Sequence, residues 1–192
     1  DIAAREPRQH TPALMAAARE GHAAILDLLL ARGAKLDAAT RDGWTALLYA
    51  AWNANHLVAH TLVERGADPN ATDRDNGYSP LTLAARRASV TLGVALLGKG
   101  ARLDHVERRS GLDALALAAG AGSAELAAEL LARGSRPTIQ GVGGESALTL
   151  AAKRGDPATI DILLAGGADP NAARADGVTP ALIAAAEGKA EA

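Results

Sequence analysis

Histidine and serine are the side chains of this sequence that could bind a metal or act as nucleophiles. His56 and His60 are four residues apart, so in a helix they would share one face and could hold a metal ion. No carboxylate lies at a matching spacing to complete such a site. Ser110, Ser123 and Ser135 fall in predicted turns without the strand–turn–helix context of a nucleophile elbow. We therefore expect no catalytic residue, no bound metal and no cofactor, and we expect that the chain is not an enzyme.

Glycine spacing, cysteine content and charge exclude further classes of site. The segments Gly120-x-Gly122 and Gly141-x-Gly143-Gly144 do not follow a predicted strand, as phosphate-binding loops do. The sequence has no cysteine, which excludes disulfides, thiolate metal sites and thiol catalysis. Its 20 basic and 22 acidic residues give a formal net charge of −2. Overall charge therefore provides no attraction to nucleic acid or to an anionic membrane.

The start of the sequence and its hydropathy bear on localisation. No apolar stretch approaches the roughly 20 residues that a membrane-spanning helix requires. The sequence begins with Asp1 and not with Met, so we expect a processed product, a trimmed chain or part of a longer protein. We expect a soluble protein that is either cytoplasmic or exported with removal of a signal peptide.

Alanine accounts for 48 of the 192 residues, whereas the sequence has two Trp, two Tyr and no Phe. A single globular core needs large side chains to fill its centre, and this sequence has few of them. Small side chains instead suit thin layers of helices that approach closely. The same composition suggests a bacterial protein.

Two sequence markers recur with one period. The pair Ala-Ala begins at residues 17, 50, 84, 118, 151 and 184, with offsets of 33, 34, 34, 33 and 33. Glycine recurs at residues 33, 66, 100, 134 and 167, with offsets of 33, 34, 34 and 33. Because both markers keep the same register through both one-residue insertions, the sequence predicts a repeat array.

Each unit is predicted to contain two short helices and a loop. The first helix follows a residue whose side-chain oxygen can accept from a backbone N–H. These residues are Thr11, Thr45, Ser79, Asp113, Ser146 and Thr179. Proline is expected at the first helical position at residues 12, 80 and 180. An inward stripe of leucines, joined by Tyr49 in the second unit, comes before Ala-Ala. A turn residue follows the Ala-Ala pair and precedes the second helix. The second helix is predicted to end at the recurring glycine described above. The turn residues are Gly21, Asn55, Gly122, Gly155 and Gly188.

These residues resemble the ankyrin repeat family. The resemblance rests on Thr-Ala-Leu-Leu-Tyr-Ala-Ala (45–51), Ser-Pro-Leu-Thr-Leu-Ala-Ala (79–85), Glu-Gly-His (20–22) and Gly-Ala-Asp-Pro-Asn at 66–70 and 167–171. It covers about residues 10–192 and implies an all-α solenoid of stacked helix pairs with projecting loop or β-hairpin fingers. The predicted organisation is one domain, 1–192, with five full repeats and a partial sixth. The unit boundaries are 10–40, 41–73, 74–107, 108–140, 141–173 and 174–192. The resemblance also implies that His22 and Asn70 have structural roles.

The resemblance implies that partners bind the fingers and the outer side of the first helices. Three of the four aromatic residues, Trp44, Trp52 and Tyr78, fall on those positions. Trp, Tyr and Arg dominate interface energetics, so we predict an aromatic anchor with a basic stretch that favours acidic partner residues. The candidate partner-binding residues are Trp44, Trp52, Asn53, Tyr78, Arg86, Arg87, Arg108, Arg109, Lys153 and Arg154. Gly120 and Ala121 are expected to leave a shallow trough between basic pairs.

A structural interpretation of the same residues is also open. In it, Trp44 and Tyr78 pack sideways against neighbouring fingers, and the arginines form a solvated face with Asp73, Asp75 and Glu107. The function that we predict is non-catalytic binding of another protein, as an inhibitor, adaptor or immunity-type protein, by a monomer that does not bind nucleic acid or insert into a membrane. The alternatives are the recognition domain of a larger enzyme or effector, and a structural module that associates with itself.

Overall fold

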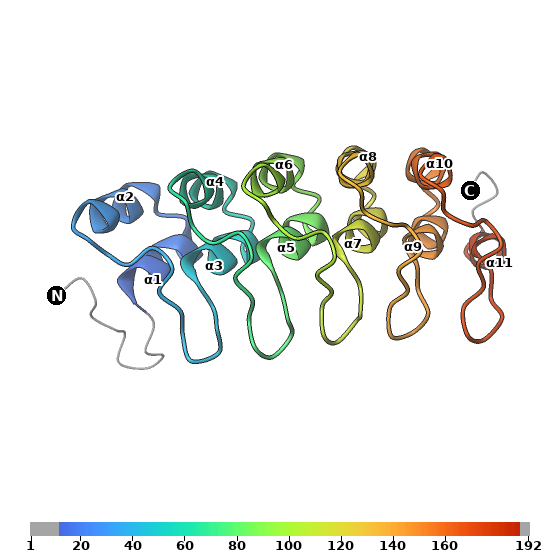
Figure 1. Cartoon of the computed structure of the whole chain (residues 1–192), viewed down its shortest axis with the longest axis horizontal. Coiled ribbons are helices and arrows are strands. Elements are labelled where there is room, and N and C mark those ends of the chain that lie inside the picture. The colour runs from blue at the N-terminus through green and yellow to red at the C-terminus, as the bar shows by residue number, and fades with distance from the viewer. Residues whose placement is uncertain (1–11, 189–192) are drawn as a thin grey trace. The chain divides into compact units, whose positions relative to one another are not determined.

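The structure, a computed structural model, describes residues 12–188, and within that range the regular elements are eleven helices (Figure 1). The helices are α1 (Ala13–Glu20), α2 (Ala23–Ala31), α3 (Ala46–Trp52), α4 (His56–Glu64), α5 (Pro80–Arg86), α6 (Val90–Gly98), α7 (Ala114–Ala121), α8 (Ala124–Ala132), α9 (Ala147–Arg154), α10 (Pro157–Ala165) and α11 (Pro180–Ala186). Helices of this length are marginal alone in water, so they depend on packing against their neighbours. The predicted all-α fold class is confirmed. None of the helices described is both long enough and apolar enough to cross a membrane.

Side-chain oxygens begin the first helix of each pair from the second pair onward, as predicted. The accepting residues are Thr45, Ser79, Asp113, Ser146 and Thr179. At α9 the cap is reciprocal, because Ser146 Oγ accepts from Thr149 N at 3.2 Å and Thr149 Oγ1 accepts from Ser146 N at 2.7 Å. Pro80 and Pro180 are the first residues of their helices. Pro12 differs from the prediction: its extended backbone, with ψ of 149°, makes it the residue before α1. Thr11 lies outside the described residues.

The predicted helix-ending glycines all have left-handed backbone conformations, with φ between 83° and 97°. They are Gly33, Gly66, Gly100, Gly134 and Gly167. At the end of α4, Gly66 N donates to Val63 O and Ala67 N donates to Leu62 O, both at 3.0 Å. These two hydrogen bonds satisfy carbonyls that a helix end otherwise leaves without partners.

The turn inside the helix pair is left-handed at Gly21, Gly122 and Gly155, as predicted, and Gly188, which follows α11, is left-handed as well. In the second and third pairs the left-handed residue is an alanine, Ala54 with φ of 57° and Ala88 with φ of 53°. The prediction for Asn55 was therefore wrong by one residue. Asn55 caps α4, and its Nδ2 donates to Ala18 O at 2.9 Å and to Arg19 O at 2.7 Å.

Leucine and alanine form the thin core between helices. The leucines that begin the predicted stripe are buried at residues 14, 47, 81, 115 and 148. The Ala-Ala pairs are buried in the first five units, and in the last unit Ala184 is buried while Ala185 is exposed. The small methyl side chains leave room for the next first helix to approach.

The described residues divide into two compact units. The first contains the described residues up to Ala84 together with Thr91–Arg102, and the second contains Ala85–Val90 and the described residues from Leu103 onward. In the first unit α1 packs on α2 and α3, α3 packs on α4, and α2 contacts α4. In the second, α7 packs on α8 and α9, α9 packs on α10 and α11, and α8 packs on α10. We call the loop between one pair and the next a finger.

Candidate functional site

Trp44 and Tyr78 are fixed in place by the fingers that come before α3 and α5. Thr40 N donates to Trp44 O at 2.9 Å, and Trp44 N donates to Thr40 Oγ1 at 3.1 Å. Tyr78 N donates to Oδ1 of the fully buried Asp73 at 2.6 Å, and Asp73 N donates to Tyr78 O at 3.2 Å. Both aromatic residues are therefore anchored through their own backbones.

The two fingers that carry these residues pack closely on each other. Arg74 N donates to Asp42 O at 2.8 Å. Gly43 has φ of +85°, and a Cβ placed on it would lie 2.7 Å from Thr72 O. Only glycine fits this position, because a side chain would meet both a left-handed backbone and the neighbouring finger. The contact fixes the spacing of Trp44 and Tyr78.

All four aromatic rings of the sequence form one cluster, which we call the aromatic cluster: Trp44, Tyr49, Trp52 and Tyr78. The Trp44 ring centroid lies 5.0 Å from that of Tyr49, 5.9 Å from that of Trp52 and 6.4 Å from that of Tyr78. Trp52 and Tyr78 are 5.3 Å apart. The Trp44–Trp52 and Trp44–Tyr78 pairs are edge-on, a favourable arrangement for ring quadrupoles.

The aromatic cluster is partly open to solvent. Trp52 is 36% exposed, and Trp44, Tyr49 and Tyr78 are partly buried. Burial raises the pKa of the Tyr49 hydroxyl, an effect that the positive charge of Arg19 opposes and the negative charge of Asp42 reinforces. The hydroxyl therefore stays protonated at neutral pH and can donate a hydrogen bond.

The sequence analysis assigned Tyr49 to the inward stripe, and the structure corrects this. Its ring lies against Trp44 in the aromatic cluster. The sequence favoured the inward stripe because the same position in the later units holds the aliphatic residues Leu83, Leu117, Leu150 and Ile183, and only the ring contact with Trp44 adds Tyr49 to the cluster. Asn53, another predicted site residue, is exposed at the end of α3, where its Nδ2 donates to Tyr49 O at 2.9 Å.

The six basic candidates lie in the second unit, whereas the aromatic cluster lies in the first. Arg86 forms an ion pair with Glu107, which is only 2% exposed. Ser110 Oγ donates to Glu107 Oε2 at 3.0 Å. Sequence reasoning named Glu107 only as part of a solvated face. The structure corrects this, because the carboxylate is buried and Arg86 compensates its charge.

The remaining basic candidates, Arg87, Arg108, Arg109, Lys153 and Arg154, are exposed. Arg154 extends across the end of α7, where its Nη1 lies 3.5 Å from Gly120 O. A Cβ on Gly122 would lie 2.1 Å from Arg154 Nε. The shallow trough expected at Gly120 and Ala121 is therefore occupied by the Arg154 side chain.

Comparison with known proteins decides the family. A family model described as ankyrin repeats in three copies matches residues 3–73 and 115–192, which is more than half of the chain. The chain belongs to the ankyrin repeat family. Ankyrin repeats are a general protein–protein interaction module, and the fold is generally non-catalytic.

Relatives and a solved structure agree with this assignment. The crystal structure of an ankyrin repeat domain from Acinetobacter baumannii is similar, with a TM-score of 0.81 and 32% identity over 93% of this chain and 92% of that one. Mitochondrial disaggregase of Bos taurus is 44% identical over 69 residues, which is 36% of this chain. An ankyrin repeat-containing protein of Treponema pallidum is 40% identical over 80 residues, 41% of this chain and 26% of that protein. The matched segment spans 10% of the length of mitochondrial disaggregase.

The residues that match ankyrin loop motifs have structural roles here. Asn70 joins two loops, because its Nδ2 donates to Gly100 O at 3.1 Å and its Oδ1 accepts from Arg102 N at 2.9 Å. His22 precedes α2 directly after the left-handed Gly21. Both observations agree with the structural interpretation of these motifs.

The other candidates for chemistry do not come together. His56 and His60 are exposed on α4, and the described part of the chain has no group of three or more His, Cys, Asp or Glu side chains that could hold a metal ion. Ser110 donates to Glu107, and Ser123 precedes α8. Gly120 and Ala121 are the last residues of α7 and Gly122 follows with a left-handed backbone, so the Gly120-x-Gly122 segment follows a helix and not the strand that precedes a phosphate-binding loop.

Proposed function

We propose that this ankyrin chain binds a partner protein through the aromatic cluster. The observation that carries the proposal is that every aromatic side chain of the sequence lies in one partly exposed group. Core packing in the rest of the described chain relies mainly on leucine and alanine, so the large rings are concentrated at one surface. Clustered Trp and Tyr give large contact areas with few rotatable bonds.

The cluster is organised in advance for binding. Finger hydrogen bonds hold the backbones of Trp44 and Tyr78, and the rings contact one another. A partner that packs on the cluster therefore has little side-chain or loop entropy to remove. The protonated Tyr49 hydroxyl supplies one hydrogen-bond donor to a surface made mainly of aromatic rings.

The exposed basic residues of the second unit favour acidic groups on a partner protein. We assign this role to Arg87, Arg108, Arg109, Lys153 and Arg154, with a smaller contribution from Arg86, whose guanidinium already compensates Glu107. Such charges act mainly on the rate of association and on the choice of partner.

The experiment is affinity capture from an extract of the cells that natively express the chain, with Trp52→Ala as the test variant. Trp52 is the last residue of α3, so its removal should leave the fold intact. Loss of a hot-spot aromatic residue costs about 2 kcal/mol or more, a reduction in affinity of roughly thirtyfold.

The matched control is Leu57→Ala, which removes an exposed apolar side chain from α4 in the same unit. Circular dichroism should show the same helical content in all three proteins. Proteins retained by the wild type and by Leu57→Ala but lost by Trp52→Ala are the expected partners. The proposal is contradicted if Trp52→Ala and a folded triple variant, with Trp44, Trp52 and Tyr78 all changed to Ala, each capture the same proteins as the wild type in equal amounts.

A second candidate is the recognition part of a larger enzyme or effector. It is favoured by the similarity of this chain to a segment that makes up only 10% of mitochondrial disaggregase. The full-length transcript of the gene distinguishes the two, because a catalytic domain in the same reading frame is expected only for the second candidate.

A further inference from the structure

The polar tips of the aromatic cluster indicate which chemical groups a ligand needs there. The Trp44 indole N–H can only donate a hydrogen bond, and the protonated Tyr49 hydroxyl can donate one as well. Neither group has a hydrogen-bond partner among residues 12–188, and both belong to partly exposed residues. A donor that is covered without an acceptor costs free energy. A ligand that packs on these rings must therefore bring hydrogen-bond acceptors.

A proline-rich segment presents backbone acceptors without backbone donors. Proline has no backbone N–H, and the polyproline II helix makes no internal hydrogen bonds, so its carbonyls are available to a partner. An α-helix uses its carbonyls internally except in the last turn. A β-strand carries one N–H for every carbonyl, and a surface rich in donors would leave those N–H groups unpaired. The hydrogen-bonding groups of the cluster therefore favour a polyproline II ligand.

The geometry of the rings fits the same ligand. The ring planes of Trp44 and Trp52 meet at 89°, and those of Trp44 and Tyr78 meet at 72°, so the three rings do not form one flat stack. Their centroids lie between 5.3 Å and 6.4 Å apart. Two residues of a polyproline II helix advance about 6 Å along its axis. Pyrrolidine rings two positions apart can therefore pack on neighbouring aromatic rings.

The charges beside the cluster fit an uncharged ligand. Besides its burial, which raises the pKa of the Tyr49 hydroxyl, the charges of Arg19 and Asp42 shift that pKa in opposite directions. Neither sign of charge therefore dominates beside the hydroxyl. A cation held between two rings needs space between their faces, and the Trp44 and Tyr49 centroids are only 5.0 Å apart. The cluster is thus a poor cage for a cationic side chain.

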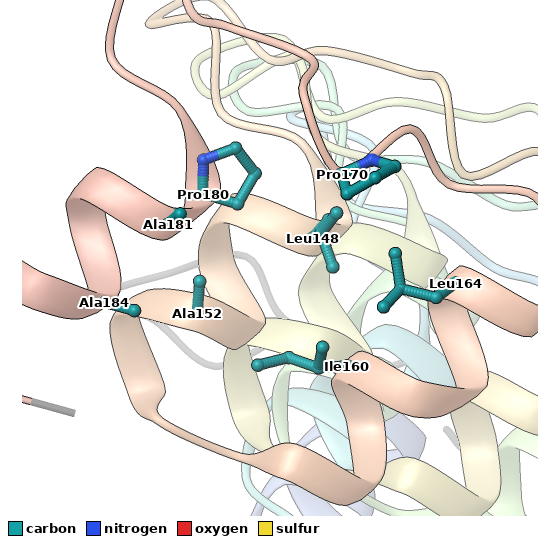
Figure 2. Close-up of a pocket in the computed structure, with 8 residues that line it drawn as sticks. All are labelled: Leu148, Ala152, Ile160, Leu164, Pro170, Pro180, Ala181 and Ala184. Atoms are coloured by element: carbon teal, nitrogen blue, oxygen red, sulfur yellow. The ribbon is translucent and has the colours of Figure 1, made fainter. Parts of the chain in front are cut away.

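An apolar hollow of about 200 Å³ beside α11 gives no comparable information about a ligand. Its lining consists of eight apolar residues from α9, α10, α11 and the finger before α11, and Figure 2 shows their side chains. No lining side chain carries a donor, an acceptor or a charge. The hollow therefore does not select one chemical class of ligand, whereas the aromatic cluster does.

We propose that the aromatic cluster binds a proline-rich segment of a partner protein in the polyproline II conformation. This inference rests on the function proposed above and specifies the chemistry of the partner. The carbonyls of the segment accept from Trp44 Nε1 and from the Tyr49 hydroxyl, and its pyrrolidine rings pack on the aromatic rings. Both sides are ordered before they meet, because the fingers hold Trp44 and Tyr78 and the ligand is a pre-formed extended helix.

Fluorescein-labelled decaproline is the probe, because it forms a polyproline II helix on its own. Fluorescence anisotropy should show saturable binding of decaproline to the full chain, and no binding of a glycine–serine peptide of the same length. Tyr49→Phe keeps the ring and removes the donor, so it should weaken binding by about twofold to tenfold, the range of one hydrogen bond. Trp52→Ala removes a ring of the contact and should weaken binding at least about tenfold.

Leu57→Ala, which removes an exposed apolar side chain from α4, is the matched control and should bind decaproline as the wild type does. Circular dichroism should show the same helical content in every variant. Tyr49→Phe keeps the test valid if Trp52→Ala loses helical content, because it deletes a single oxygen atom.

Two results overturn the inference and leave the proposed function standing, provided that Trp52→Ala still loses captured proteins. One is the absence of saturable decaproline binding by the wild type, or equal binding by the wild type and Tyr49→Phe. The other is tighter binding of decaarginine than of decaproline, weakened by Trp52→Ala, which would assign the cluster to cationic side chains. Equal decaproline binding and equal protein capture by the wild type and Trp52→Ala would contradict the inference and the proposed function together.

Discussion

Two buried carboxylates of the second unit are stabilised to different degrees. Glu107 has the Arg86 guanidinium and the Ser110 hydroxyl as partners. Asp113 caps α7 through Oδ1, which accepts from Ala116 N at 2.8 Å, while its Oδ2 is buried without a hydrogen-bond partner in the structure. Burial raises the pKa of the Asp113 carboxyl above its ordinary value of 3.8, and hydrogen bonds from the backbone only partly offset this effect. The ionised form therefore costs stability in the folded state.

We predict that Asp113→Asn raises the free energy of unfolding at pH 7. Because the pKa is higher in the folded chain, the protonated form favours folding, and its contribution is lost as pH rises through the folded pKa. Asn keeps the capping oxygen and cannot ionise. Urea unfolding at a series of pH values should show the advantage of the variant at neutral pH and its disappearance as pH falls below 3.8, the ordinary value.

Asp113→Ser is the control, since it also retains a capping oxygen without a carboxyl group. It should show the same pH trend as Asp113→Asn relative to the wild type. A difference between Asp113→Asn and the wild type that stays constant with pH would mean that titration of Asp113 does not contribute.

At the scale of elements, the turns inside the second and third helix pairs are strained. Ala54 and Ala88 have left-handed backbones that other pairs assign to glycine. A left-handed L-residue costs about 1–2 kcal/mol relative to its preferred conformations. Both alanines are exposed, so glycine would lose no packing there.

Ala54→Gly and Ala88→Gly are each expected to raise the free energy of unfolding by about 1 kcal/mol, measured by urea denaturation followed at 222 nm. Ala128→Gly, at an exposed position inside α8, should instead lower it by about 1 kcal/mol. Destabilisation by all three substitutions would contradict the assignment of strain to the turns.

The elements were predictable where their signals are local. Helix starts at Thr45 and Ser146, and helix ends at glycines such as Gly66, depend on residues within one turn of the helix. The turn before α4 was misplaced because its left-handed residue is Ala54, a type that gives no turn signal. The repeat register itself places this turn at Ala54, because Ala54 follows the Ala50-Ala51 pair at the same distance as Gly21 follows Ala17-Ala18; the residue type of Asn55 was the misleading signal.

At the scale of the whole molecule, the net charge of −2 conceals a local excess of basic side chains. Partner binding should weaken as salt rises, because exposed charges are screened within about 10 Å at 0.1 M ionic strength. Arg109→Glu should reduce the dependence of the association rate on salt. Arg136→Glu, an equal change of charge in the finger after α8, should reduce it less. Equal effects of both, measured by stopped-flow association, would mean that only net charge matters.

The candidate site was only partly predictable because its contacts join distant parts of the sequence. Trp44, Trp52 and Tyr78 were found from their place in the repeat, but the addition of Tyr49 depends on the ring contact with Trp44. The pairing of Arg86 with Glu107 spans 21 residues and depends on how the finger folds back. That the six units form one domain remains a prediction.

The most direct test of partner binding at the aromatic cluster is ¹⁹F NMR of the chain labelled with 5-fluorotryptophan. The sequence has two tryptophans, Trp44 and Trp52, and both belong to the cluster. Titration with a captured partner should shift both resonances, and the shifts should saturate with the affinity measured independently. Full binding of that partner with both resonances unchanged would contradict the account.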